Sequence, residues 1–84
     1  MSKRIKVQVK QKHITKGIAG DGDSCPIAYA LKDMGYKGLH VEGDQIIGSA
    51  DYAPLPLKAQ RFIRKFDDGE KVKPFNFTIT WNPE

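Results

Sequence analysis

Segments near both ends of the chain alternate strictly between apolar and polar residues, and this alternation limits the folds open to the chain. Residues 4 to 10 place Ile5, Val7 and Val9 on one side, and residues 75 to 81 alternate aromatic and aliphatic side chains with Asn and Thr. Successive side chains of a strand point to opposite faces of a sheet, so each segment predicts a strand with one buried face. A parallel sheet covered on both faces is disfavoured, because its strands would be apolar on both sides.

A helix is expected after the glycine-rich run of residues 17 to 24. Asp23 or Ser24 can cap its start, since a short polar side chain accepts a hydrogen bond from the first helical N–H groups. Gly35 supplies a stop signal. The expected apolar face consists of Ile27, Leu31 and Met34. Residues 13 to 18 predict one helical turn before the glycine-rich run.

Residues 38 to 49 predict a β-hairpin around a Gly43-Asp44 turn, and a second amphipathic helix follows Pro54-Leu55-Pro56 and stops near Asp68-Gly69. The buried side of this helix is expected to comprise Ala59, Phe62, Ile63 and Phe66. The order strand, helix, strand, strand, helix, strand predicts an α+β fold of the ferredoxin-like, split β-α-β type. Two helices would then cover one face of a four-stranded sheet.

Length and composition predict one domain over residues 1 to 84 that is held together by packing alone. A chain of 84 residues has room for one hydrophobic core, and its single Cys cannot form an internal disulfide. No Cys or His cluster has the spacing of a metal site, so neither a metal nor a cofactor is predicted. No stretch approaches the ~18 apolar residues of a membrane span, and the basic start leads into no apolar signal core. We therefore expect a cytoplasmic protein without a membrane partner.

Positive charge is concentrated near the N-terminus and on the second helix. The net charge is +4, and six Lys and Arg residues precede the first acid, Asp21. Basic surfaces attract nucleic acid or acidic protein surfaces at long range. The leading hypothesis is therefore a non-enzymatic protein that binds a host macromolecule, protein or nucleic acid, and a solvated surface is the alternative. The residues predicted to bind it are Arg4, Lys6, Lys10, Lys58, Arg61, Arg64 and Lys65.

Base stacking on the sheet, as in an RRM, is disfavoured. The aromatic residues of the last strand are expected to face the core, and the first strand carries none. The polar face of the first strand is expected to lie at the surface of the sheet, and so is His40 in the hairpin.

The glycine-rich loop of residues 17 to 25 is the basis of a second hypothesis. It leads into a helix start, where free N–H groups favour an anion. The protein would then bind or sequester a phosphorylated small molecule or nucleotide signal, as a homo-oligomer because so small a chain makes few deep pockets. The residues predicted to bind this ligand are His13, Lys16, Gly20, Gly22, Ser24 and Cys25. Asp21 and Asp23 argue against it, since their charges repel phosphate, and a capped turn is the alternative.

A third hypothesis is a thiol enzyme. Cys25 lies near a helix start, a position that lowers the pKa of a thiol, and His13 would serve as its base. Asp21 or Asp23 would orient the His. A small buried thiol explains Cys25 more simply, so the sequence favours a binding protein over an enzyme.

Several short motifs resemble a family of small uncharacterised proteins encoded by bacteriophages and their bacterial hosts. These motifs are His13-Ile14, Cys25-Pro26-Ile27-Ala28, Phe62-Ile63, Phe66-Asp67 with Gly69, and Pro74-Phe75 with Phe77. The resemblance runs from about residue 5 to residue 79. It implies a phage setting, in which small proteins bind host proteins, nucleic acids or signalling nucleotides, and it transfers no residue roles.

Overall fold

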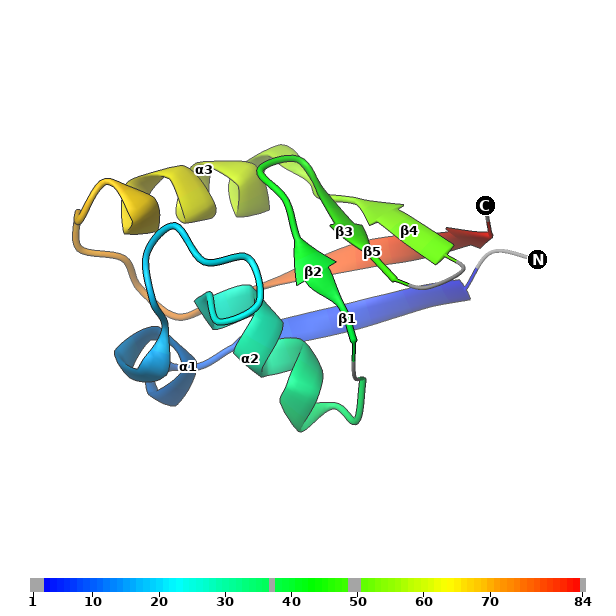
Figure 1. The fold of residues 1–84 in the computed structure, drawn as a ribbon, viewed down its shortest axis with the longest axis horizontal. Helices are drawn as coiled ribbons and strands as arrows, with labels where there is room; N and C mark the ends of the chain where they lie inside the picture. The colour runs from blue at the N-terminus through cyan, green and yellow to red at the C-terminus, as the bar shows by residue number, and fades with distance from the viewer. Residues whose placement is uncertain (1–2, 37, 49–50, 84) are drawn as a thin grey trace.

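The computed structural model describes residues 3–36, 38–48 and 51–83. The chain has the predicted α+β composition, with helices gathered toward one end of the strands (Figure 1). The elements are β1 (Lys3–Val9), α1 (Gln11–Lys16), α2 (Pro26–Asp33), β2 (His40–Val41), β3 (Gln45–Ile47), β4 (Asp51–Pro54), α3 (Leu57–Asp67) and β5 (Phe75–Pro83).

Within the described residues, five strands form one antiparallel sheet in the order β1-β5-β4-β3-β2. The two alternating segments lie side by side, because β1 pairs with β5 along its whole length as far as Val9↔Phe75. The strands β2, β3 and β4 form a meander, and the described residues join it to β5 through two residue pairs, one of them Tyr52↔Asn82. The long β1–β5 ladder and the meander are therefore two parts of one sheet.

The structure differs from the expected four-stranded ferredoxin-like sheet. A split β-α-β unit has its first strand inside the sheet, whereas β1 lies at the edge and pairs with β5 alone among the described strands. The sequence prediction also missed β4. That strand is short, lacks alternation and ends at Pro54, and Pro is a residue that normally argues against a strand.

The predicted hairpin is present, since His40 pairs with Ile47 and Val41 with Ile46. Its predicted end at residue 49 lies outside the described residues.

The core lies on one face of the sheet, where α2 and α3 pack. Its members alternate along the strands and recur at helical spacing, as the sequence patterns require. They include Val7, Val9, Phe77 and Ile79 from the sheet, Ile27 and Leu31 from α2, and Phe62 and Ile63 from α3. On the opposite face the side chains Arg4, Lys6, Gln8, Lys10, Asn76, Thr78 and Thr80 are exposed. This open face is polar and basic.

The N-cap of α2 is Cys25, and neither Asp23 nor Ser24 caps the helix as expected. The Cys25 Sγ accepts a hydrogen bond from the backbone N–H of Ala28 at 3.4 Å. Pro26 occupies the first helical position, where its missing N–H costs no hydrogen bond. The cap therefore lies one residue after Ser24 and two after Asp23, at a buried side chain.

The ends of α1 and α2 also differ from the sequence prediction. The expected turn over residues 13 to 18 is a helix that begins at Gln11 and ends at Lys16. Met34 was expected on the apolar face of α2, but it follows the last helical residue and is 42% exposed. The following Gly35 has a φ of 96°, which favours glycine and ends the helix as predicted.

Replacing Leu31 by Ala tests the packing of α2 on the sheet. Leu31 is fully buried, so Leu31→Ala is expected to lower the free energy of unfolding by about 2–5 kcal/mol through lost burial and a residual cavity. Urea denaturation measures this loss. Met34→Ala is the matched control, because Met34 is largely exposed. Equal stability of the two variants would contradict the packing of α2 described above.

Candidate functional site

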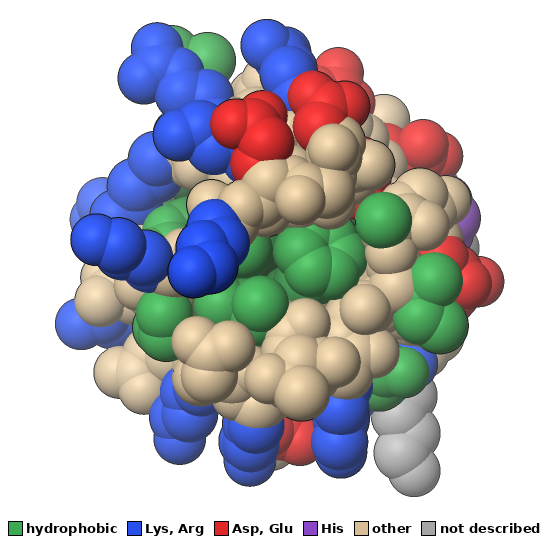
Figure 2. Space-filling model, turned by 90° about the vertical axis from the view of Figure 1, so that its left-hand side faces the viewer, with side chains coloured by type: hydrophobic (Ala, Val, Ile, Leu, Met, Phe, Trp, Pro, Cys, Tyr) green, Lys and Arg blue, Asp and Glu red, His purple; other side chains and the backbone are tan. Residues whose placement is uncertain are grey.

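A groove of about 380 Å³ runs between α3 and the segment that connects it to β5. Its lining combines cationic side chains with an apolar floor. The cations are Lys58, Arg61, Lys65, Lys71 and Lys73, and the floor consists of Phe62, Val72, Pro74 and Phe75. The groove opens at the end of the molecule seen in Figure 2. There Lys and Arg side chains gather beside a hydrophobic hollow, and Asp and Glu side chains lie above it and on its other side.

One wall of the groove is formed by one side of α3. Lys58, Arg61 and Lys65 lie three and four residues apart, so they share one side of α3. Phe62 and Ile63 on the neighbouring side are buried in the core and hold the helix on the sheet. The cations of this wall are therefore held by a helix that is itself well anchored.

The other wall is formed by the segment after α3, where the chain reverses its direction. Gly69 adopts a φ of 81°, a conformation that favours glycine. Its N–H donates to the carbonyl of Phe66 at 3.1 Å, and the N–H of Glu70 donates to the carbonyl of Lys65 at 2.9 Å. These bonds close the helix end and send the segment with Lys71 and Lys73 back along α3.

The floor is built from aromatic contacts between α3 and β5. The ring of Phe75 lies 4.5 Å from that of Phe62 and 5.4 Å from that of Phe77, centroid to centroid. Phe77 is buried, whereas Phe75 and Val72 stay partly exposed. Apolar surface thus remains accessible directly beneath the ring of cations.

Among the described lining residues, the absence of carboxylates distinguishes this groove from two other hollows that contain Lys or Arg. Among the described residues that line it there is no Asp or Glu. The hollow at β1, lined by Lys6 and Lys10, includes Asp33. The hollow that contains Arg64 includes Asp44. In those two places a carboxylate competes for the cations, so the groove beside α3 is better suited than either of them to an external anion.

The structure brings together only some of the residues predicted to bind a macromolecule. Lys58, Arg61 and Lys65 share the groove, but Arg64 lies on another side of α3. Arg4, Lys6 and Lys10 lie on the open face of the sheet. Sequence analysis missed Lys71 and Lys73. Their signal was available, because both follow the helix stop at Gly69 and alternate with Val72.

The glycine-rich loop is bonded to the elements on each side of it. The carbonyl of Gly22 accepts the N–H of Val41 in β2 at 2.9 Å, and the N–H of Gly20 donates to the carboxylate of Asp67 in α3 at 2.9 Å. A side chain at position 22 would not fit, since a Cβ there would lie 2.4 Å from the carbonyl oxygen of Val41. Glycine at this position allows the loop to approach the edge of the sheet.

Hydrogen bonds within the protein occupy several of the backbone N–H groups that would have to bind a phosphate at this loop. Besides Gly20, the N–H of Asp23 donates to the Asp21 carboxylate at 2.9 Å, and the N–H of Ser24 donates to the Asp21 carbonyl at 3.2 Å. Lys32 donates to the carbonyl of Asp23, whereas Lys16 is exposed at the end of α1. The loop therefore presents carboxylates next to N–H groups that already have partners within the protein.

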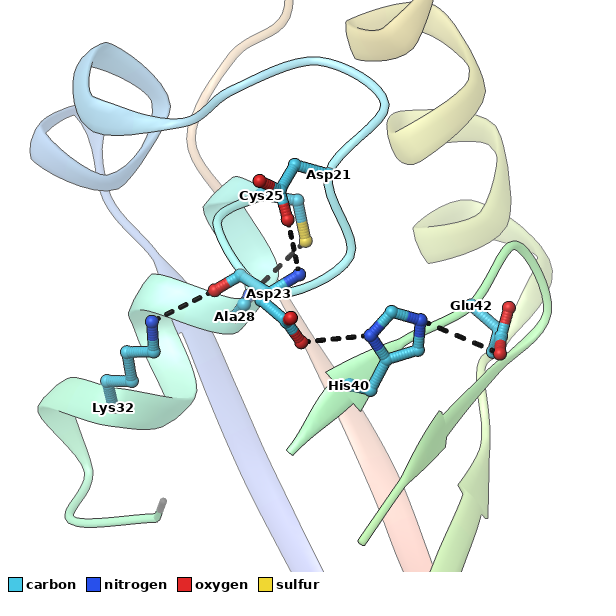
Figure 3. Close-up of polar contacts among 7 residues, drawn as sticks. All are labelled: Asp21, Asp23, Cys25, Ala28, Lys32, His40 and Glu42. Atoms are coloured by element: carbon cyan, nitrogen blue, oxygen red, sulfur yellow. Dashed lines mark hydrogen bonds and ion pairs between the residues drawn. The ribbon is translucent and has the colours of Figure 1, made fainter. Parts of the chain in front are cut away.

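His40 joins β2 to the glycine-rich loop (Figure 3). Its Nδ1 lies 2.9 Å from a carboxylate oxygen of Asp23, and its Nε2 lies 3.6 Å from one of Glu42. The hydrogen bond with Asp23, together with the negative charges of Asp23, Glu42 and Asp21, raises the pKa of His40. His40 is thus a surface residue, as expected, that also forms a charge-dependent link to the loop.

The structure does not bring the proposed thiol pair together. His13 is buried, its Nδ1 accepts the N–H of Lys10 at 2.8 Å, and its Nε2 donates to Asp33 at 2.7 Å. This hydrogen bond and that of Lys12 hold the pKa of Asp33 at about 2. Burial raises the pKa of the Cys25 thiol, which disfavours the reactive thiolate. His13 joins α1 to α2, and Cys25 caps a helix.

Raising the pH from about 6 to about 8 is expected to weaken the attachment of the loop. The pKa of His40 in the folded protein lies above its ordinary value of about 6.5. The stabilisation by the charged imidazole is therefore complete below about pH 6.5 and lost as the pH rises through the folded pKa. The attachment is measured by hydrogen exchange of the Val41 amide, which donates to Gly22 of the loop, after correction for intrinsic exchange rates. His40→Gln should abolish the pH dependence, and equal protection of the wild type at both pH values would contradict it.

Slow alkylation is expected for Cys25. The thiol is buried and its pKa is raised, so iodoacetamide at neutral pH should modify the folded protein at least about tenfold more slowly than the urea-unfolded chain. Mass spectrometry follows the reaction. Equal rates in the two states would instead favour the thiol-enzyme hypothesis.

Comparison with protein-family models gives no match, and neither curated proteins nor solved structures give one. The resemblance to small phage proteins thus stays a prediction from the residue pattern. Among the residues that the structure describes, no helix is long and apolar enough to cross a membrane. The same residues contain no cluster of three or more His, Cys, Asp or Glu side chains arranged for a metal ion.

Proposed function

We propose that the protein is a non-enzymatic nucleic-acid-binding protein whose main contact surface is the groove between α3 and β5. The observation that carries the proposal is the lining of the groove, where cations from two segments surround an apolar floor without any described carboxylate. Each nucleotide supplies a phosphate charge together with a flat, largely apolar ring. Nucleic acid therefore matches both parts of this lining.

The open face of the sheet supports the same proposal as a secondary surface. Arg4 and Lys6 are exposed on β1 and Lys10 is exposed directly after it, and the positions of β5 that pair with Arg4 and Lys6 carry uncharged Thr. Such dispersed cations add to attraction and to the salt dependence of binding without reading sequence.

A phage setting and the bacterial cytoplasm are part of this proposal. Their support is the resemblance to small phage proteins and the composition of the chain, which has a single Cys and a basic surface. The host macromolecule of the leading hypothesis would then be host nucleic acid.

Salt dependence and one pair of variants test the proposal. A strand whose phosphates contact three to five cations should bind roughly 20- to 130-fold more weakly at about 200 mM salt than at about 50 mM. Lys65→Gln should reduce the slope of log K against log salt by about 0.7, because it removes one contact. Fluorescence anisotropy with labelled oligonucleotides measures both effects.

Arg64→Gln is the matched control, since Arg64 adjoins Lys65 and carries the same charge but lies outside the groove. It should leave the slope close to that of the wild type. Equal effects of the two substitutions would show that only net charge matters, and absence of salt-dependent binding would remove the proposal.

A further inference from the structure

Resting on the nucleic-acid function proposed above, we further propose that the groove is specific for single strands and holds one unpaired base on its apolar floor. The two rows of cations would contact the phosphates on either side of this base. The proposal names the class of nucleic acid, which the charge of the surface alone does not distinguish.

The floor supplies the contact for the base. Val72 and Phe75 are partly exposed between the cationic walls, and the Phe75 ring is held by its packing against Phe62. A base placed there removes apolar surface from water on both partners, and such contacts tolerate any base sequence. A ligand that offers only charge does not remove the apolar surface of this floor from water.

The arrangement of the walls fits a strand that passes between them. Lys58, Arg61 and Lys65 lie on α3, whereas Lys71 and Lys73 lie on the returning segment. Phosphates that precede and follow an inserted base can therefore both meet cations. The volume of about 380 Å³ lies near the lower end of the range for small-molecule pockets, which suits a single nucleotide and not several.

A duplex fits this site poorly. Its bases are stacked and paired, so a base can reach the floor only if it is first flipped out of the stack, which costs free energy. The end of α3 adds a second obstacle, because Asp67, Asp68 and Glu70 are exposed where the chain passes from α3 to the returning segment. Their charges would repel the additional phosphate backbone that a duplex carries past the rim.

Three probes of equal length test the inference by fluorescence anisotropy at one salt concentration. They are an oligothymidine of about 12 nucleotides, the corresponding duplex, and the same single strand with abasic sites in place of its bases. We expect the oligothymidine to bind at least about fivefold more tightly than either of the other two, since one stacked base contributes a factor of about 5 to 150.

Substitutions at Phe75 separate the base contact from the charge contact. Phe75→Leu should weaken oligothymidine binding about fivefold or more, leave the salt slope unchanged and have no effect on the abasic strand. Phe75→Tyr should retain binding because it keeps the ring. Tyr52→Leu is the matched control, as Tyr52 is also a partly exposed aromatic residue of a strand but does not line the groove. Circular dichroism establishes that each variant is folded.

The outcomes distinguish this inference from the proposed function. Salt-dependent binding that is equal for single strand, duplex and abasic strand would overturn the inference and leave the nucleic-acid function in place. Equal competition by polyglutamate would overturn it too, since charge alone would then be recognised. Absence of salt-dependent binding to every probe would remove both proposals.

Discussion

The antiparallel pairing of β1 with β5 is the interaction on which the rest of the structure depends. It joins the two ends of the chain along a ladder that runs to Val9↔Phe75. Because both strands alternate, the pairing produces one apolar face, on which α2 and α3 pack, and one basic face that stays open. Phe75, where β5 begins, extends this apolar face into the groove and contacts Phe62 of α3. The fold and the candidate site thus share one set of hydrophobic contacts.

Charge is divided between two regions at the helical end of the molecule. Cations line the groove between α3 and β5, whereas the carboxylates of Asp21 and Asp23 lie in the glycine-rich loop and bond to N–H groups and to His40. The loop is therefore a structural connection between α3, α2 and β2. An anion approaching this end meets repulsion at the loop and attraction at the groove, so the fold itself directs it to one surface.

Periodicity predicted most of the elements, because alternation and helical spacing report directly which side of a segment is buried. It failed where local patterns are weak. The strand β4 lacks alternation, and the cap of α2 is a buried Cys that propensity ranks below its polar neighbours. Half of the candidate groove was predictable from the basic side of α3. The contribution of Lys71 and Lys73 required the reversal at Gly69, which places a separate segment beside the helix.

By itself the sequence determined the α+β class, the buried side of the long strands and helices, and the positive charge of α3. These are local properties, since each depends on residues a few positions apart. Only the tertiary structure decided the order of the strands, the burial of His13 between α1 and α2, and which cations share a groove. Those features depend on residues that lie far apart in the chain. The packing of the whole domain brings these residues together, and no local sequence pattern encodes their proximity.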